Sequence, residues 1–188
     1  MPLITANVLV PQSREVVWAT LKDIRAVAEC MPGVELIEEV DTNAFKGRLR
    51  TKLGAIHANF DGEAKISMDE ETKSGRIDAR GVDSKGGSRA SAEIQYATHE
   101  DPVGTRLDIS ADIKLQGRLA QFGKSGLLQE ICDQMVVTFG NNLAERASRG
   151  ATAVLVREVK VGSLFRRAMW SSMKAFWSKR RQSPLGEE

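Results

Sequence analysis

The sequence predicts an α+β domain in which an antiparallel sheet curves around one long helix. Between residues 34 and 115, short segments with alternating apolar and polar residues follow one another, which is typical of half-buried antiparallel strands. Two short helical segments precede them. After Gly117 the apolar residues recur at three- and four-residue spacing, as in an amphipathic helix. A strongly curved sheet wrapped around this closing helix explains the order of the elements.

The chain begins with a predicted strand and two short helices. Residues 3–10 are mostly apolar and β-branched, and Pro11 stops the strand. Ser13 is a good N-cap for a short helix behind it. Asp23 can cap a second short helix, which Met31-Pro32-Gly33 ends. Together these residues predict a strand followed by a pair of helices.

Six further strands are predicted between clusters of turn residues. The alternation is clearest in Ala90, Ala92, Ile94 and Tyr96, whose side chains share one face of a strand. The predicted strands cover residues 34–40, 44–53, 56–68, 76–82, 88–98 and 105–115. With residues 3–10 they make a seven-stranded antiparallel sheet.

A long amphipathic helix closes the domain. No proline interrupts the chain between Pro102 and Pro184, and Gly150 offers a stop, so we expect a helix of about 25 residues. Its apolar positions are Leu119, Phe122, Leu127, Leu128, Ile131, Met135, Val136, Phe139 and Leu143.

Charge is distributed unevenly along the 188 residues, although the net charge is only +2. Residues 159–188 contain seven Lys or Arg and two acids, so this segment is strongly basic and the rest of the chain is faintly acidic. On a helical wheel the aromatic and Met residues of the segment share one broad face, and basic residues occupy the opposite side. This composition is typical of a helix that lies in a membrane interface.

The predicted membrane-binding helix spans residues 164–182. Its membrane-binding residues are Phe165, Arg166, Arg167, Met169, Trp170, Met173, Lys174, Phe176, Trp177, Lys179, Arg180 and Arg181. Docking of this helix on its own domain or on a partner protein is the alternative. Binding to nucleic acid is disfavoured, because the acidic remainder of the chain would oppose it.

Other features of the sequence indicate a cytoplasmic location. Cys30 and Cys132 form neither a disulfide framework nor a metal-binding pattern, so we expect two free buried thiols. The N-terminus lacks the features of a signal peptide, and no apolar run is long enough to span a bilayer. We expect a protein that is peripheral on the inner face of the cell membrane.

No catalytic or metal-binding pattern is visible. His57 lies in a predicted strand and His99 beside a turn, and neither is near a partner motif for a nucleophile. The segment from Gly117 to Ser125 ends in Gly-Lys-Ser, but its glycines are separated by five residues where a phosphate-binding loop has four. We therefore expect no catalytic residues and no metal or covalent cofactor.

Six short motifs carry a resemblance to a known family. They are Cys30-Met31-Pro32-Gly33-Val34, Phe45-Lys46-Gly47, Leu53-Gly54-Ala55-Ile56, Phe60-Asp61-Gly62, Gly104-Thr105 and the segment from Gly117 to Gly123. In this order and spacing they resemble the family of the carbon monoxide dehydrogenase G subunit, in the START-like, helix-grip superfamily, over residues 1 to about 147. The resemblance implies a helix-grip fold with an apolar cavity between the sheet and the long helix. It also implies association with an aerobic carbon monoxide dehydrogenase or a related molybdenum hydroxylase, and recruitment to the membrane through a C-terminal segment.

The sequence and the resemblance together predict a non-catalytic accessory protein. We expect residues 1–147 to form the ligand-cavity domain, residues 148–163 a linker and residues 183–188 a tail after the membrane-binding helix. The predicted ligand is a lipophilic molecule, such as a non-covalently bound quinone. The predicted cavity residues are Phe60, Phe122, Leu128, Ile131, Met135 and Phe139. Two alternatives remain, a cyclase or hydrolase that acts in the same cavity and a purely structural membrane adaptor.

Overall fold

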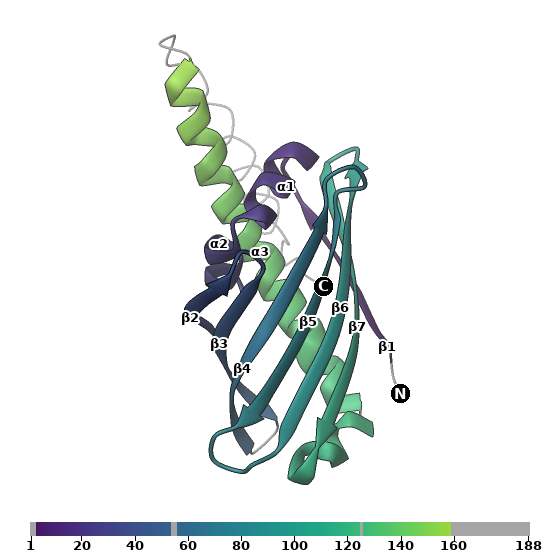
Figure 1. The fold of residues 1–188 in the computed structure, drawn as a ribbon. Coiled ribbons are helices and arrows are strands. Elements are labelled where there is room, and N and C mark those ends of the chain that lie inside the picture. Colours follow the sequence, from purple (N-terminus) through teal and green to yellow (C-terminus); the bar gives the residue numbers. More distant parts are fainter. Residues whose placement is uncertain (1–2, 54–55, 125, 159–188) are drawn as a thin grey trace, which may run out of the picture. The chain divides into compact units, whose positions relative to one another are not determined.

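The computed structural model describes residues 3–53, 56–124 and 126–158, and its elements follow the predicted order (Figure 1). The strands are β1 (Leu3–Val10), β2 (Val34–Asp41), β3 (Ala44–Leu53), β4 (Ile56–Asp69), β5 (Ser74–Asp83), β6 (Arg89–Asp101) and β7 (Gly104–Gln116). The helices are α1 (Arg14–Lys22), α2 (Ile24–Cys30), the 3-10 helix η1 (Gly117–Lys124) and α3 (Gly126–Glu158). The predicted strands are all present, and their ends agree within three residues.

The strands form one antiparallel sheet in the order β1-β7-β6-β5-β4-β3-β2. Consecutive strands from β2 to β7 pair with their neighbours in sequence, and β1 adds to the far side of β7. α3 runs obliquely across one face of this sheet, and α1 and α2 lie near one end of it (Figure 1). The predicted α+β class, with a curved seven-stranded sheet around a long helix, is confirmed.

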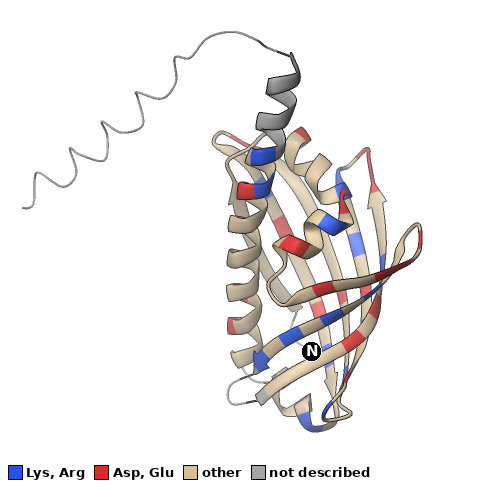
Figure 2. Ribbon diagram, turned by 90° about the vertical axis from the view of Figure 1, so that its left-hand side faces the viewer, with Lys and Arg blue, Asp and Glu red and all other residues tan. Residues whose placement is uncertain are grey.

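The face of the sheet that α3 covers is called the inner face. On β1 it carries Ile4 and Val10, which are buried, whereas the alternate residues Leu3 and Leu9 are exposed. Leu128 of α3 packs in one cluster with Ile4, which places the helix on this side. Figure 2 shows Lys, Arg, Asp and Glu along the strands and on the short helices, whereas the coloured part of α3 carries few charged residues except near its end.

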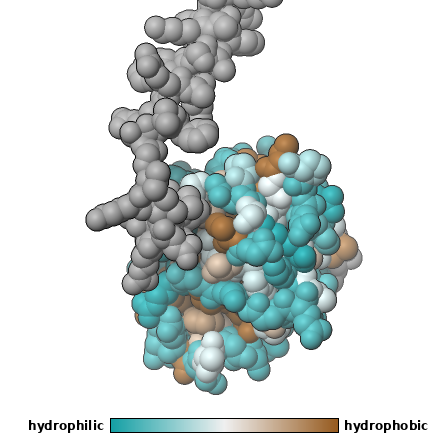
Figure 3. All heavy atoms as spheres, turned by 90° about the horizontal axis from the view of Figure 1, so that it is seen from above, coloured by the Kyte–Doolittle hydropathy of each residue, from teal (hydrophilic) through white to brown (hydrophobic). Residues whose placement is uncertain are grey.

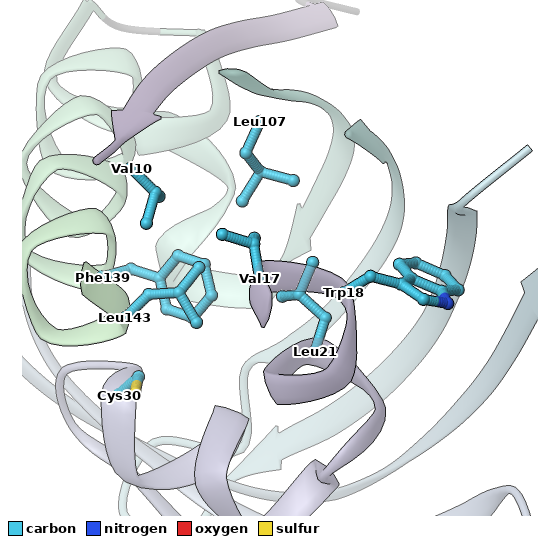
Figure 4. Packing of buried hydrophobic residues seen from close by; sticks show 8 residues of the cluster. All are labelled: Val10, Val17, Trp18, Leu21, Cys30, Leu107, Phe139 and Leu143. Carbon is cyan, nitrogen blue, oxygen red and sulfur yellow. The ribbon is translucent and has the colours of Figure 1, made fainter. Parts of the chain in front are cut away.

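The largest core cluster closes the end of the inner face at which α1 lies. Figure 4 shows Phe139 and Leu143 of α3 pointing toward Val17 and Leu21 of α1. The cluster also contains Val10, Trp18, Cys30 and Leu107. Val17 and Leu143 are fully buried. Since burial of a Val or Leu side chain contributes about 1.5–3 kcal/mol, this cluster is a main source of stability.

α1 is also tied to the turn between β4 and β5 by polar contacts. The indole nitrogen of Trp18 donates to Glu70 at 2.7 Å, and the Lys22 ammonium lies 2.8 Å from the same carboxylate. Arg14 donates to the Thr72 carbonyl oxygen at 2.8 Å and to the Thr98 hydroxyl at 3.2 Å. These contacts hold α1 across the end of the sheet.

Two smaller clusters lie farther from α1, one at the opposite end of the inner face and one beside its centre on the β1 and β7 side. One contains Ala58, Phe60 and Leu119, so it joins β4 to η1. The other contains Ile4, Ala111 and Leu128, so it joins β1 and β7 to the beginning of α3. The hydrophobic core is therefore divided among three clusters, two at the ends of the inner face and one beside its centre.

The helix α3 differs from the sequence-based expectation at both ends. The apolar residues Leu119 and Phe122 lie in η1, and α3 itself begins only at Gly126. It then continues past Gly150 to Glu158. A glycine inside a helix costs only about 1 kcal/mol relative to Ala, and no proline follows until Pro184, so Gly150 does not end the helix. None of the described helices is long and apolar enough to span a membrane.

Candidate functional site

The centre of the inner face carries an apolar surface that lies between the core clusters. It consists of two directly paired rows of residues from β4, β5 and β6, which we call the inner band: Ile66, Ile77 and Ile94, and Ala64, Ala79 and Ala92. Ile94 packs against the cluster that contains Leu128. The other five residues belong to none of the three core clusters.

The inner band is only half-buried. Solvent reaches each of its six residues, whereas Ile4, Leu107 and Leu143 on the same side of the sheet or on α3 are 3%, 1% and 0% exposed. Half-buried apolar surface inside a fold loses part of the stabilisation that close packing provides. Seen from the end at which α1 lies, hydrophilic residues cover most of the visible surface, with apolar residues between them in several separate places (Figure 3). The inner band is therefore an apolar surface that a lipophilic molecule could cover.

The structure distributes the six predicted cavity residues around this band. Phe60, Phe122 and Ile131 belong to the cluster between β4 and η1 or pack against it. Leu128 lies in the cluster with β1 and β7, and Phe139 in the cluster with α1. Met135 is half-buried and lies on α3 between these positions, in none of the clusters. Whether these residues bind a ligand stays a prediction.

Two pockets lie on the opposite, outer face of the sheet. The first, of about 750 Å³, is lined by residues of β1, β4, β5, β6 and β7, among them the outward-facing Thr5, Gln95 and Arg76. The second, of about 590 Å³, includes Arg80 and Lys114, which flank Ser91 in directly paired positions. Residues of α3 line neither pocket, and none of the six predicted cavity residues does.

Both histidines point away from the inner face. His57 is exposed on β4, where it alternates with the inward-facing Ala58. His99 is exposed on β6 and lies 3.3 Å from the Asp108 carboxylate, on the outer face. Within residues 3–53, 56–124 and 126–158, no group of three or more His, Cys, Asp or Glu side chains could hold a metal ion.

The two cysteines are free thiols, as the sequence predicts. Cys30 is buried in the cluster with α1, and this burial raises the pKa of its thiol. Cys132 on α3 is half-buried, and burial raises the pKa of its thiol to about 11. Both thiols are therefore protonated at neutral pH, and a protonated thiol is a poor nucleophile.

Tyr96 is a functional candidate that the sequence reasoning did not single out. It lies on the inner face of β6, one row beyond Ile94, and its direct partner on β5 is Gly75. A Cβ atom added to Gly75 would lie 2.3 Å from both Cζ and the hydroxyl oxygen of Tyr96, so the ring lies over this glycine. Burial raises the pKa of Tyr96 to about 12. Its place in the alternation marked it as inward-facing, but the contact with Gly75 depends on strand register.

Of the predicted linker, residues 148–158 belong to α3, whereas the predicted membrane-binding helix lies wholly outside the described residues. All twelve predicted membrane-binding residues, from Phe165 to Arg181, lie outside the described residues. The binding of this segment to membranes stays a prediction.

Comparison with known proteins identifies a family by sequence. The family of the carbon monoxide dehydrogenase G subunit (CoxG) matches residues 7–148. A search of curated proteins finds no match.

Solved structures with the same fold are similar to this chain at low sequence identity. A conserved protein from Geobacillus kaustophilus is 16% identical with a TM-score of 0.69, covering 79% of this chain and 97% of its own. The Zhui aromatase/cyclase from Streptomyces sp. R1128 is 17% identical with a TM-score of 0.56, covering 81% and 97%. A START superfamily protein from Mycobacterium smegmatis is 14% identical with a TM-score of 0.52, covering 78% and 97%. These similarities show a START-like helix-grip fold.

Proposed function

Because this chain belongs to the family of the carbon monoxide dehydrogenase G subunit, we propose that it is a non-catalytic accessory protein of a molybdenum hydroxylase such as an aerobic carbon monoxide dehydrogenase. It holds a lipophilic molecule, a quinone, against the inner face of its sheet. Its basic C-terminal segment recruits the enzyme to the inner face of the cell membrane. The protein thereby brings an electron acceptor and the enzyme to the same surface.

The half-buried inner band carries this proposal. Core clusters close both ends of the inner face, whereas Ile66, Ile77 and Ala79 between them remain in contact with solvent. A lipophilic molecule that covers apolar surface gains roughly 25 cal/mol per Å² removed from water, on both partners. The band therefore favours a flat or extended apolar ligand over a charged one.

The chemistry of the inner face supports binding over catalysis. A hydrolase or cyclase needs a base or acid in contact with its substrate. Among the described residues, both histidines face outward, and the buried Asp83 accepts a hydrogen bond from the Asn59 amide at 3.1 Å, at the end of β5. Among the described residues, Tyr96 and Cys132 belong to the groups that pack around the inner band, and burial raises the pKa of each, so both are protonated at neutral pH.

The substitution Met135→Trp tests the ligand site. Met135 lies on the sheet-facing side of α3 but in none of the core clusters, so a larger side chain there should occupy the ligand's space and leave the core intact. We expect the full-length wild type to bind decylubiquinone in equilibrium dialysis and Met135→Trp to lose this binding at an unchanged melting temperature. Val137→Trp is the matched control, because Val137 is 53% exposed on the same helix.

Two outcomes would contradict the proposal. A wild type that binds no quinone or other lipophilic molecule would leave the structural membrane adaptor as the function. Equal loss of binding in Met135→Trp and Val137→Trp would place the site elsewhere.

The aromatase/cyclase among the similar structures keeps an enzymatic function as the second candidate. Purified protein should turn over neither esters nor polyketide-like substrates, and it should not oxidise carbon monoxide. Deletion of its gene should leave the partner dehydrogenase active with an artificial dye but impair electron delivery to membrane quinone. Turnover by the purified protein that Met135→Trp abolishes would instead assign an enzyme.

A further inference from the structure

The side chain of Tyr96 brings a polar group to the inner face. Tyr96 is the only tyrosine of the chain. It packs as a half-buried side chain against the cluster that contains Trp18 and Leu107, next to Met68 and Ile109. Within the described part of the chain, no group forms a hydrogen bond with its hydroxyl.

Two other polar side chains on this face are already satisfied. Thr98 is fully buried, donates to the Lys73 carbonyl oxygen at 2.9 Å and accepts from Arg14. Thr105 is fully buried and donates to the Gln12 carbonyl oxygen at 2.7 Å. The Tyr96 hydroxyl differs from both because it is half-buried and has capacity to donate and accept.

Strand register places the Tyr96 hydroxyl one row away from the inner band. Tyr96, Gly75 and Met68 form one directly paired row of β6, β5 and β4, and the next row is Ile94, Ile77 and Ile66 of the band. Because Gly75 has no side chain, the ring of Tyr96 lies across β5 with its hydroxyl over this glycine. The hydroxyl therefore lies at the edge of the apolar band, at the end closed by the core cluster with α1.

The protonation state of Tyr96 suits a hydrogen-bond donor. Burial raises its pKa to about 12, so the phenol is neutral at physiological pH. The hydroxyl is not one of the buried side-chain atoms that lack a hydrogen-bond partner, which among the described residues are Ser88 Oγ and Asp112 Oδ1, so it still reaches solvent. A ligand oxygen can therefore take the place of water as its hydrogen-bond acceptor. A carbonyl oxygen accepts such a bond and carries no charge that the apolar band would disfavour.

We propose that the Tyr96 hydroxyl donates a hydrogen bond to a carbonyl oxygen of a lipophilic ligand that lies on the inner band, and that Gly75 provides the space for this arrangement. This inference rests on the proposed ligand-carrying function. The Tyr96 hydroxyl is the group that would distinguish a ligand with a carbonyl oxygen, such as a quinone or ketone, from a hydrocarbon of the same shape.

Fluorenone and fluorene form a matched pair of probes, since both have the same ring skeleton and only fluorenone has a carbonyl oxygen. The Tyr96→Phe variant removes the hydroxyl and keeps the ring. Because one neutral hydrogen bond contributes up to about tenfold in affinity, we expect fluorenone to bind Tyr96→Phe about five- to tenfold more weakly than the wild type. The affinity for fluorene should be unchanged. Isothermal titration calorimetry on the full-length proteins measures both.

Two further variants separate the hydrogen bond from packing. Ile77→Val removes one methylene-sized group from the band and should weaken both probes equally. Gly75→Ala should displace the ring and reduce the preference for fluorenone although the hydroxyl is retained.

Nuclear magnetic resonance tests the contact directly in the wild type. With ¹³Cζ-labelled tyrosine the wild type gives a single tyrosine signal, which should shift with fluorenone and not with fluorene.

Each result decides between defined alternatives. If Tyr96→Phe binds both probes as the wild type does, or loses both equally, the role of Tyr96 is refuted while the carrier function stands. If the wild type binds neither probe nor decylubiquinone, the proposed ligand-carrying function itself fails. If Tyr96→Phe does not fold, the labelled wild type still tests the contact, and an unmoved signal on fluorenone binding overturns it.

Discussion

A single tyrosine gives this fold an internal reporter of its packing. Tyr96 ionises with a pKa of about 12 because burial disfavours the charged phenolate, against an ordinary value of 10.0. The pKa is higher in the folded than in the unfolded chain. The stabilisation linked to Tyr96 is therefore fully present below pH 10 and is lost as the pH rises from about 10 to 12.

Absorbance at 295 nm measures this titration for Tyr96 alone. In guanidinium chloride we expect half-ionisation near pH 10, and in the native protein only near pH 12 or when the fold is lost. Circular dichroism at the same pH values is the control for folding. Ionisation near pH 10 with an intact dichroism spectrum would show that Tyr96 is solvated and not packed over Gly75.

At the scale of elements, one glycine decides how closely α3 approaches the sheet. A Cβ atom added to Gly140 would lie 2.0 Å from Cγ2 and 3.0 Å from Cβ of Val8 on β1. Val8 is β-branched, so its side chain has little freedom to move away. Beside this contact, Phe139 and Leu143 of α3 are buried in the core. Because Gly140 has no side chain, α3 can pack closely against β1 at the end of the sheet where Phe139 and Leu143 are buried.

Gly140→Ala should destabilise the fold by about 1–3 kcal/mol, as overpacking of a core usually does. Val8→Ala in the same chain should restore part of the loss, because it removes both γ carbons of Val8, including the Cγ2 that the added Cβ meets. Gly126→Ala is the matched control on the same helix, since an added Cβ there meets nothing within 4 Å. Urea denaturation of the wild type and of the three variants (Gly140→Ala, Gly140→Ala with Val8→Ala, and Gly126→Ala) measures these differences. Equal effects of Gly140→Ala and Gly126→Ala would mean that α3 does not approach β1 this closely.

At the scale of the whole molecule, the faintly acidic domain and the basic C-terminal segment have different proposed tasks. The compact unit Met1–Ala153 contains all seven described strands and the three core clusters. It therefore has the contacts of an independently folded domain. The basic segment 164–181 has six Lys or Arg residues, each of which adds up to about 1 kcal/mol near an anionic surface.

Truncation after Gly162 should leave a folded domain that no longer sediments with anionic vesicles. Full-length protein should sediment with vesicles that contain phosphatidylglycerol, because apolar insertion and charge attraction act together. Circular dichroism of the truncated chain is the control for folding. Equal sedimentation of both chains would exclude the segment as the anchor and favour its docking on the partner enzyme.

Two double substitutions separate the apolar from the electrostatic contribution. Trp170→Ser with Trp177→Ser should weaken vesicle binding even at low salt. Charge reversal of Arg180 and Arg181 should weaken it mainly at low salt, since surface charges are screened over about 10 Å at 0.1 M salt. If both pairs show the same salt dependence, the helix does not bind by its aromatic face.

The amino-acid sequence by itself determined the order and type of the elements. Alternation such as that of Ala90, Ala92, Ile94 and Tyr96 depends only on the two-residue period of a strand. It therefore predicts the strand and its inward-facing side without knowledge of the tertiary structure. The N-cap at Asp23 is also a local signal, because it depends only on residues close in the sequence. In the structure the Asp23 carboxylate accepts a hydrogen bond from the Ala26 amide at 3.1 Å. The motifs from Cys30 to Gly123 were also sufficient to identify the family.

Only the tertiary structure decided which residues meet across the inner face. The contact of Tyr96 with Gly75 depends on the register of β5 and β6, and that of Gly140 with Val8 on the position of α3. Four of the six predicted cavity residues, Leu128, Ile131, Met135 and Phe139, shared one helical spacing. Yet Phe139, Leu128 and Ile131 joined three different clusters. Periodicity shows that a side chain faces inward, but close packing of distant segments decides whether it fills the core or borders a ligand site.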